Sequence, residues 1–152
     1  MSPNARTGIW GLLGKLRTWT MTFVPAVFVA AGFVTAAFAA THDFNNDHRS
    51  DILWRNPSPS VTFNVVIWFM NGATAIGGGA PGSVNSDWAV VGQRDFNGDG
   101  NCDILWRNGS TGQVVMWFMN GASAVGNGSP GTVTTDWSII GTGDFNGDGK
   151  SG

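Results

Sequence analysis

Oxygen-bearing side chains recur at fixed spacing in two segments of the chain, and they are the residues best suited to chemistry. They occupy positions 1, 3, 5 and 9 of each segment, namely Asp43, Asn45, Asp47 and Asp51, then Asp95, Asn97, Asp99 and Asp103. On a tightly curled loop, alternate side chains point inward, and the carbonyl of position 7 (Arg49 or Asn101) turns in as a further ligand. Hard oxygen donors without His or Cys select Ca²⁺ over zinc or copper. The spacing therefore predicts two calcium loops.

A third copy of the pattern ends the sequence and departs from the other two. It carries Asp144, Asn146 and Asp148, but Gly152 stands at position 9. We expect this site to be incomplete because it lacks a carboxylate. The first loop departs at position 6, where His48 replaces glycine. A left-handed backbone is costlier for histidine than for glycine, so weaker calcium binding is expected there.

Two other interpretations of these loops can be weighed from the sequence. An EF-hand begins with the same spacing but needs a bidentate Glu at position 12, where this chain has Trp54 or Trp106. The loops are therefore not EF-hands. An isolated D-x-N-x-D segment can also be an Asx-rich turn that holds no metal. Three copies in register favour calcium over that alternative.

The loops belong to a longer internal repeat. DFNNDHRSDILWRN at 43–56 returns as DFNGDGNCDILWRN at 95–108, and VVIWFMNGATAIGGGAPGSV at 65–84 returns as VVMWFMNGASAVGNGSPGTV at 114–133. The organisation predicted is a first unit at 43–94, a second at 95–143 and the start of a third at 144–152, all within a repeat region at 40–152. A period near 50 residues is typical of β-propeller blades.

Short strands joined by turns are expected within each unit. Apolar, β-branched and aromatic runs at 103–107, 113–119 and 137–141 predict strands, and Asn-Gly pairs follow the first two. The fold class predicted is all-β, with propeller-type blades of short antiparallel strands. Two units and the start of a third are preceded by an N-terminal signal helix.

Residues 1–39 differ from the rest of the chain. Arg6, Lys15 and Arg17 precede an apolar run that ends at Ala37-Phe38-Ala39, as in a secretory signal peptide cut after Ala39. An uncleaved membrane anchor is the alternative, because about 20 apolar residues can span a bilayer. Both interpretations predict a secreted or cell-surface protein that meets a membrane only through an uncleaved leader.

Composition excludes several functions. All ten acidic residues are Asp, and the net charge of -2 leaves no basic patch for nucleic acid. With no Glu and with eight Asp in the loops, no catalytic residue is predicted and the chain is not expected to be an enzyme. Cys102 is the only cysteine, so no intrachain disulfide can form. At position 8 of its loop, its thiol is expected to be exposed and able to form an intermolecular disulfide.

The strings VVGQRDFNGDGNCDILWRN and IIGTGDFNGDGKSG resemble FG-GAP or VCBS-type repeats of bacterial secreted proteins, which are similar to the calcium-binding blades of integrin-like β-propellers. The resemblance covers 43–152. It implies Ca²⁺ as the cofactor, held by the loops between the first two strands of a blade. It also implies a surface or secreted module for adhesion or for binding protein or glycan.

The function predicted is a calcium-binding repeat module whose partner is an unidentified extracellular protein or glycan. The alternative is a lectin-like protein that assembles a propeller from several chains, which makes a homo-oligomer possible. A fragment of a secreted enzyme is the least favoured interpretation. The repeated tryptophans, among them Trp54, Trp68, Trp106, Trp117 and Trp137, are expected to serve core packing more than sugar stacking.

Overall fold

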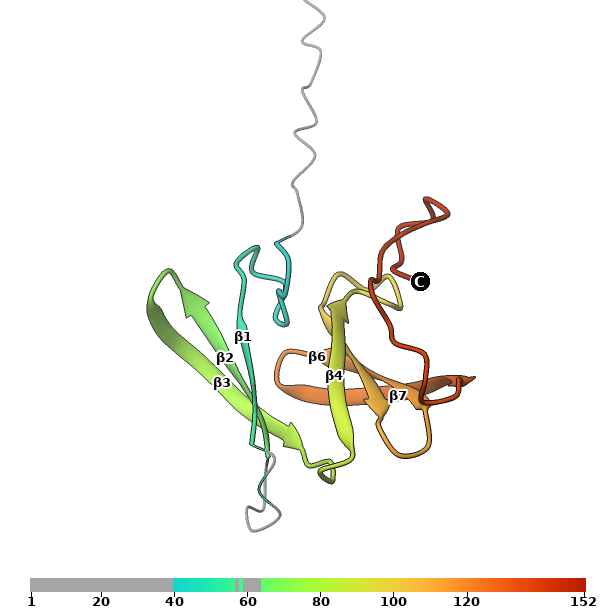
Figure 1. The fold of residues 1–152 in the computed structure, drawn as a ribbon. Coiled ribbons are helices and arrows are strands. Elements are labelled where there is room, and N and C mark those ends of the chain that lie inside the picture. Colours follow the sequence, from blue (N-terminus) through green and yellow to red (C-terminus); the bar gives the residue numbers. More distant parts are fainter. Residues whose placement is uncertain (1–39, 57, 59–63) are drawn as a thin grey trace, which may run out of the picture. The chain divides into compact units, whose positions relative to one another are not determined.

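Seven short strands make up the regular structure of the computed structural model, which describes residues 40–56, 58 and 64–152 (Figure 1). They are β1 (Ile52–Arg55), β2 (Val65–Asn71), β3 (Thr74–Gly82), β4 (Trp88–Arg94), β5 (Asp103–Asn108), β6 (Gln113–Asn120) and β7 (Ser123–Thr132). The all-β prediction is confirmed for these residues. The predicted signal helix and leader lie outside them. Within the described ranges, no helix has the length and apolar character needed to cross a membrane.

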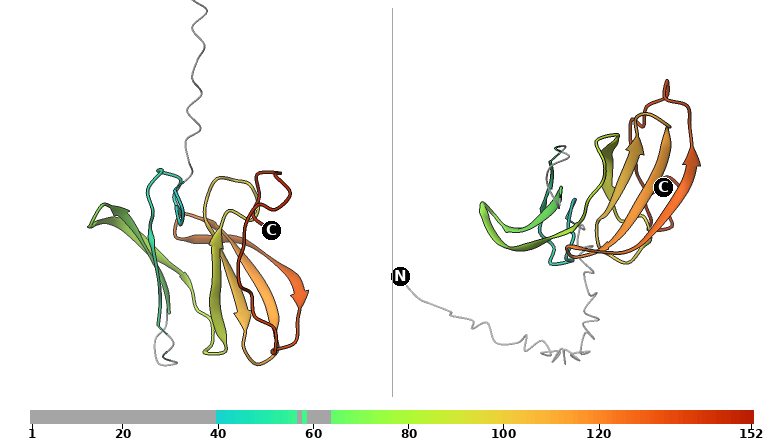
Figure 2. Two further views of the ribbon diagram at one scale, coloured as in Figure 1. Left: turned by 45° about the horizontal axis from the view of Figure 1, so that its top comes forward. Right: turned by 90° about the horizontal axis from the view of Figure 1, so that it is seen from below.

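The strands form two antiparallel sheets whose division differs from the predicted units, because β4, at the end of the predicted first unit (43–94), belongs to the second sheet. The first sheet has the order β1-β2-β3 and the second has the order β4-β5-β6-β7 (Figure 2). Each sheet is a meander in which sequence neighbours pair. The second has the four strands expected of a propeller blade, whereas the first has three. The described strands make two blade-like sheets and no closed ring.

Tight turns connect the last two strands of each sheet, β2 to β3 and β6 to β7, because the repeat places Asn-Gly there. Asn71 pairs with Thr74 and Asn120 pairs with Ser123, so the glycine of each turn must reverse the chain within two residues. Gly72 and Gly121 take left-handed φ values of 61° and 59°. Glycine adopts that region without steric cost, which fixes the register of each hairpin.

One predicted strand does not form. The run at 137–141 was expected to be a strand, but in the structure this segment does not pair with any described strand. Its counterpart in the preceding unit, β4, is held by pairing with β5. No described strand is available to pair with 137–141 in the same way, and a strand needs such a partner to satisfy its backbone N–H and C=O groups.

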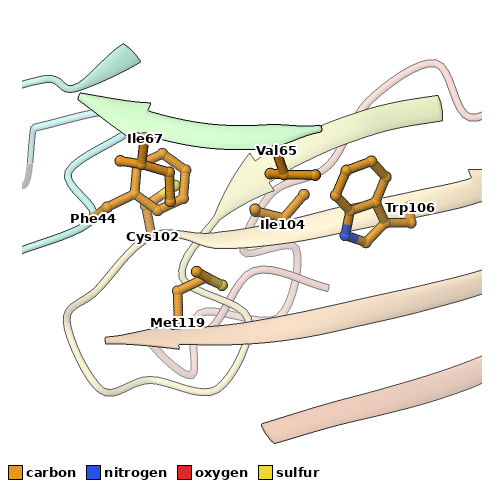
Figure 3. Close-up of a cluster of buried hydrophobic side chains, with 7 residues drawn as sticks. All are labelled: Phe44, Val65, Ile67, Cys102, Ile104, Trp106 and Met119. Atoms are coloured by element: carbon orange, nitrogen blue, oxygen red, sulfur yellow. The ribbon is translucent and has the colours of Figure 1, made fainter. Parts of the chain in front are cut away.

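The main core lies between the two sheets and joins side chains from both units (Figure 3). The first unit contributes Phe44, Val65 and Ile67, and the second contributes Cys102, Ile104, Trp106 and Met119. Each apolar side chain removed from water in this way contributes about 1.5–3 kcal/mol. A smaller cluster of Phe96, Leu105 and Val114 lies on the other side of the second sheet, where Ile139 packs against it.

The tryptophans divide between core and surface, so the packing prediction is right for only part of the set. Trp106 is 1% exposed, and Trp88 and Trp117 pack against the main core. Trp54, Trp68 and Trp137 are instead 47%, 44% and 67% exposed. The second sheet buries its tryptophans against the first sheet, whereas the described residues place no sheet over Trp54 and Trp68 of the first, and Trp137 lies outside both sheets.

Cys102 is buried, so the prediction of an exposed thiol is wrong. Its side chain sits in the main core, and its backbone N–H donates a 2.7 Å hydrogen bond to the carbonyl of Asp43. Position 8 of the second loop faces the first unit, which sequence spacing within one loop does not reveal. Burial first, and then the charge of Asp103, raise the pKa of the Cys102 thiol to about 12.

We therefore expect Cys102 to be inert toward alkylating reagents in the folded chain. Because the thiolate is the reacting species, labelling by iodoacetamide at pH 8 should be roughly 100-fold slower, or more, than in the unfolded chain. Mass spectrometry of samples quenched over time, with and without denaturant, measures both rates. Equal rates would contradict the buried position.

Candidate functional site

Three loops with the same backbone shape carry the predicted ligands. We name residues 43–51 the first loop, 95–103 the second loop and 144–152 the third loop. In all three, positions 4 and 6 are left-handed, with φ between 57° and 88°; these residues are Asn46, His48, Gly98, Gly100, Gly147 and Gly149. The expectation that His48 adopts positive φ is confirmed, at 66°. Two left-handed residues in each loop produce the curl that the aspartate spacing requires.

The carboxylate at position 1 caps the curled backbone from inside. In the second loop, Asp95 accepts hydrogen bonds from the N–H groups of Gly98 (2.6 Å), Asp99 (3.3 Å) and Gly100 (2.9 Å). Asp144 accepts the equivalent three in the third loop at 2.6, 3.1 and 2.9 Å. In the first loop, Asp43 accepts from the N–H of His48 at 2.7 Å. Position 1 therefore organises the loop.

Positions 3 and 5 form two successive Asx turns. The Oδ1 atom of Asn97 accepts from the N–H of Asp99 at 2.9 Å, and Oδ1 of Asp99 accepts from the N–H of Asn101 at 2.8 Å. The amide of Asn97 also donates to Oδ2 of Asp99 at 2.9 Å. The local hydrogen bonds are therefore those of Asx turns. Such turns do not exclude a cation, because the side-chain oxygens keep lone pairs that the hydrogen bonds do not use.

Position 9 joins each complete loop to its sheet. Asp103 is fully buried and accepts two backbone hydrogen bonds, from Phe96 at 2.9 Å and from Met119 in β6 at 2.8 Å. Asp51 does the same with Phe44 at 2.9 Å and Met70 at 3.0 Å. This cross-linking role was not foreseen from the sequence, because Met119 lies 16 residues from Asp103. The third loop has Gly152 here and lacks the connection.

Negative charge is crowded in the second loop. Burial raises the pKa of Asp103 to about 6, and the charges of Asp99 and Asp95 act in the same direction, while its two backbone hydrogen bonds act to lower it. Asp51 is shifted upward for the same reasons, with Asp43 and Asp47 as the neighbouring charges. A cation beside these carboxylates would offset both the desolvation and the repulsion.

The donor chemistry of the loops fits a hard cation, but the described side chains are not arranged around one. Among the described residues, no group of three or more His, Cys, Asp or Glu side chains is placed to hold a metal ion. The carboxylates are instead directed at backbone N–H groups. The ligand sets predicted for the three loops, including the carbonyls of Arg49 and Asn101, therefore remain predictions.

Consecutive loops are joined through their backbones. The N–H at position 8 of each later loop donates to the carbonyl at position 1 of the loop before it: Cys102 to Asp43 at 2.7 Å and Ser151 to Asp95 at 2.8 Å. A cavity of about 220 Å³ is bordered by residues of all three loops, among them Asp43, Asp95 and Gly149. Each of the later loops is therefore in direct backbone contact with the loop before it.

The first loop differs from the second in two ways that disfavour a cation. His48 holds a left-handed conformation that costs a side chain about 1 kcal/mol or more. Arg49 also places its guanidinium 3.1 Å from Oδ2 of Asp47 and partly neutralises it, whereas Asn101 stands at the same position of the second loop.

We expect the double change His48→Gly and Arg49→Asn to tighten Ca²⁺ binding by the first loop about 10-fold, which corresponds to about 1.4 kcal/mol. Calorimetric titration should be done in a chain whose second loop is silenced by Asp99→Asn, so that only the first loop is measured. The converse change, Gly100→His in the otherwise native chain, should weaken the second loop. Unchanged affinity in both would refute the explanation based on backbone strain and charge.

Comparison with known proteins identifies the second unit. Residues 95–151 match the family model described as an FG-GAP-like repeat. No curated protein and no solved structure matches the chain. The matched segment begins at the first residue of the second loop and includes all of the third loop except Gly152.

Proposed function

We propose that this chain, an FG-GAP-type repeat protein, binds Ca²⁺ in its first and second loops and uses the ion to fix the turns between neighbouring strands. The observation that supports the proposal best is the charge crowding in the second loop. Asp95, Asp99 and Asp103 lie close enough for the first two to raise the pKa of the third, and a cation is the usual remedy for such a cluster.

The position of the loops would convert binding energy into folding energy. The second loop connects β4 to β5, and its last residue is hydrogen-bonded to β6 through Asp103. Its Cys102 N–H reaches the first loop. An ion held in this loop would therefore stabilise three strands of one sheet and the contact between units, since ligand binding to the folded state alone adds directly to stability.

For the whole molecule we propose a non-enzymatic module that acts outside the cytoplasm, in adhesion or in binding an extracellular protein or glycan. The FG-GAP-like repeat is a non-enzymatic, integrin-like repeat module, which supports this class of function. Export rests on the sequence of residues 1–39. The partner's identity is left to a binding screen with extracellular proteins and glycans, run with Ca²⁺ and with a chelator.

The calcium proposal is tested by thermal unfolding of the chain with Ca²⁺ and with a chelator. Asp99→Asn removes one ligand charge and keeps an oxygen that can accept the N–H of Asn101. Asp87→Asn is the matched control, because it makes the same charge change at an exposed site outside the loops. A melting temperature that responds to Ca²⁺ in the control and less so in Asp99→Asn supports the proposal. Indifference of the native chain to both ion and chelator would refute it.

A further inference from the structure

β1 lies at an edge of the first sheet, whereas its counterpart by repeat lies inside the second sheet. β1 corresponds by repeat to β5, which lies between β4 and β6 and pairs with both. β1 pairs with β2 on one side only, and no described strand lies on the other side. An edge of this kind presents unpaired backbone groups that can accept another strand.

The side chains beside this edge are exposed where their counterparts are buried. Trp54 is 47% exposed and Ile52 is 38% exposed, whereas Trp106 and Ile104 at the same repeat positions are 1% and 0% exposed. The ring pair of Trp54 and Trp68, 5.0 Å apart at 59°, has the same geometry as that of Trp106 and Trp117, 5.2 Å apart at 60°. This surface is thus preformed, and no described strand covers it.

The chain also contains a segment that corresponds by repeat to β4, the strand that the first sheet lacks beside β1. Residues 137–141 (WSIIG) correspond by repeat to the first five residues of β4 (WAVVG), and they carry no ladder. Arg107 orients the segment by donating to the carbonyls of Thr134 (2.9 Å) and Trp137 (2.8 Å). Trp137 is 67% exposed and Ile140 is fully exposed, so apolar surface is available for a partner.

We infer that the chain associates head to tail, with residues 137–141 of one copy added as a fourth strand at the β1 edge of a second copy. The pairing of β4 with β5 supplies the register. Ala89 pairs with Arg107 and Val90 pairs with Trp106, which places Ser138 opposite Arg55 and Ile139 opposite Trp54 of the second copy. Backbone hydrogen bonds provide the affinity in such strand addition, and alternate side chains provide the specificity.

The hydrogen bonds at one end of the β1 edge limit where the added segment can lie. The carbonyl of His42 already accepts the N–H of Asp51 at 2.8 Å. The added segment is therefore confined to the part of β1 from Leu53 onward, where no described residue pairs with the edge.

Two variants of the full chain, each with one cysteine added to the native Cys102, test the inference. A chain with Arg55→Cys is mixed with a chain with Ser138→Cys in Ca²⁺ under mild oxidation, and the products are separated on a non-reducing gel. Cross-strand positions bring Cβ atoms to about 4.5–5.5 Å, close enough for a disulfide to form after small adjustments. Native Cys102 is buried and should not compete. We expect a mixed disulfide of two chains.

The matched control mixes Arg55→Cys with Val125→Cys, since Val125 is 63% exposed in β7 and lies outside the proposed interface. The mixed product should form at least 10-fold faster in the Ser138 pair than in this control. Association through any other surface, residues 1–39 included, would not favour that pair. Equal yields would overturn the inference, and so would a monomeric mass of the native chain by sedimentation. A monomeric mass would mean that any strand paired with the β1 edge comes from the same chain.

Discussion

Replacing Asp103 with alanine is expected to lower the free energy of unfolding by about 4 kcal/mol in the presence of a chelator, and by more in Ca²⁺, because the second loop then also loses a proposed ligand. The carboxylate accepts the N–H groups of Phe96 and Met119 in a fully buried position. Each hydrogen bond to a charged group contributes about 1.5–3 kcal/mol, and the truncation leaves two buried donors without an acceptor. The cost of burying Asp103 itself offsets part of this loss.

The matched comparison is Asp99→Ala in the same loop. Asp99 is exposed and accepts hydrogen bonds only from within its own loop. In the presence of a chelator, Asp99→Ala should therefore lower the free energy of unfolding by about 1 kcal/mol. Urea unfolding of the native chain and of both variants, with Ca²⁺ and with chelator, separates the two roles. If Asp103→Ala is as stable as Asp99→Ala in chelator, the proposed link from loop to sheet is wrong.

Saturation with Ca²⁺ is expected to raise the free energy of unfolding by about 5 kcal/mol. A ligand at 100 times its dissociation constant contributes about 2.7 kcal/mol per site, and two complete loops are proposed to bind. For a domain of this size, that corresponds to a rise in melting temperature of about 20 °C or more. Asp99→Asn should lose about half of the increase, because the first loop is left intact, and Asp87→Asn should keep all of it.

The stabilisation by Ca²⁺ should depend on pH, in a direction set by the raised pKa of Asp103. Its pKa is raised from 3.8 to about 6 in the folded chain. Without Ca²⁺, its protonation therefore stabilises the fold fully below pH 3.8, and this contribution is lost as the pH rises through 6. Because Ca²⁺ must displace that proton, stabilisation by the ion should be smaller at pH 5 than at pH 7.5. An equal or larger effect at pH 5 would contradict a ligand role for Asp103.

The fold was predictable to the extent that each strand carries its own signal. Repetition of ILWRN and WFMNG marked β1, β2, β5 and β6 and the turns after β2 and β6, because alternating large apolar residues and Asn-Gly turns act locally. The glycine-rich strands β3 and β7 were not predicted. The missing strand at 137–141 and the burial of Cys102 could not be predicted in that way. The first depends on whether a partner strand is present, and the second on the packing of one unit against the next.

The candidate site shows the same limit. The spacing of the aspartates correctly indicated a curled loop, and His48 was correctly expected to take a left-handed backbone. The second role of Asp51 and Asp103, as buried acceptors for strands far along the chain, leaves no mark in the loop itself. A carboxylate followed at once by a buried apolar strand, as in DILW, is the signal that could have suggested it.

Calcium binding to the second loop is the central claim, and isothermal titration of the chelator-treated chain tests it most directly. We predict two ions per chain for the native sequence and for Asp87→Asn, and one ion per chain for Asp99→Asn, with weaker residual binding assigned to the first loop. Absence of saturable heat in the native chain, or the same stoichiometry and affinity in Asp99→Asn, would contradict the claim.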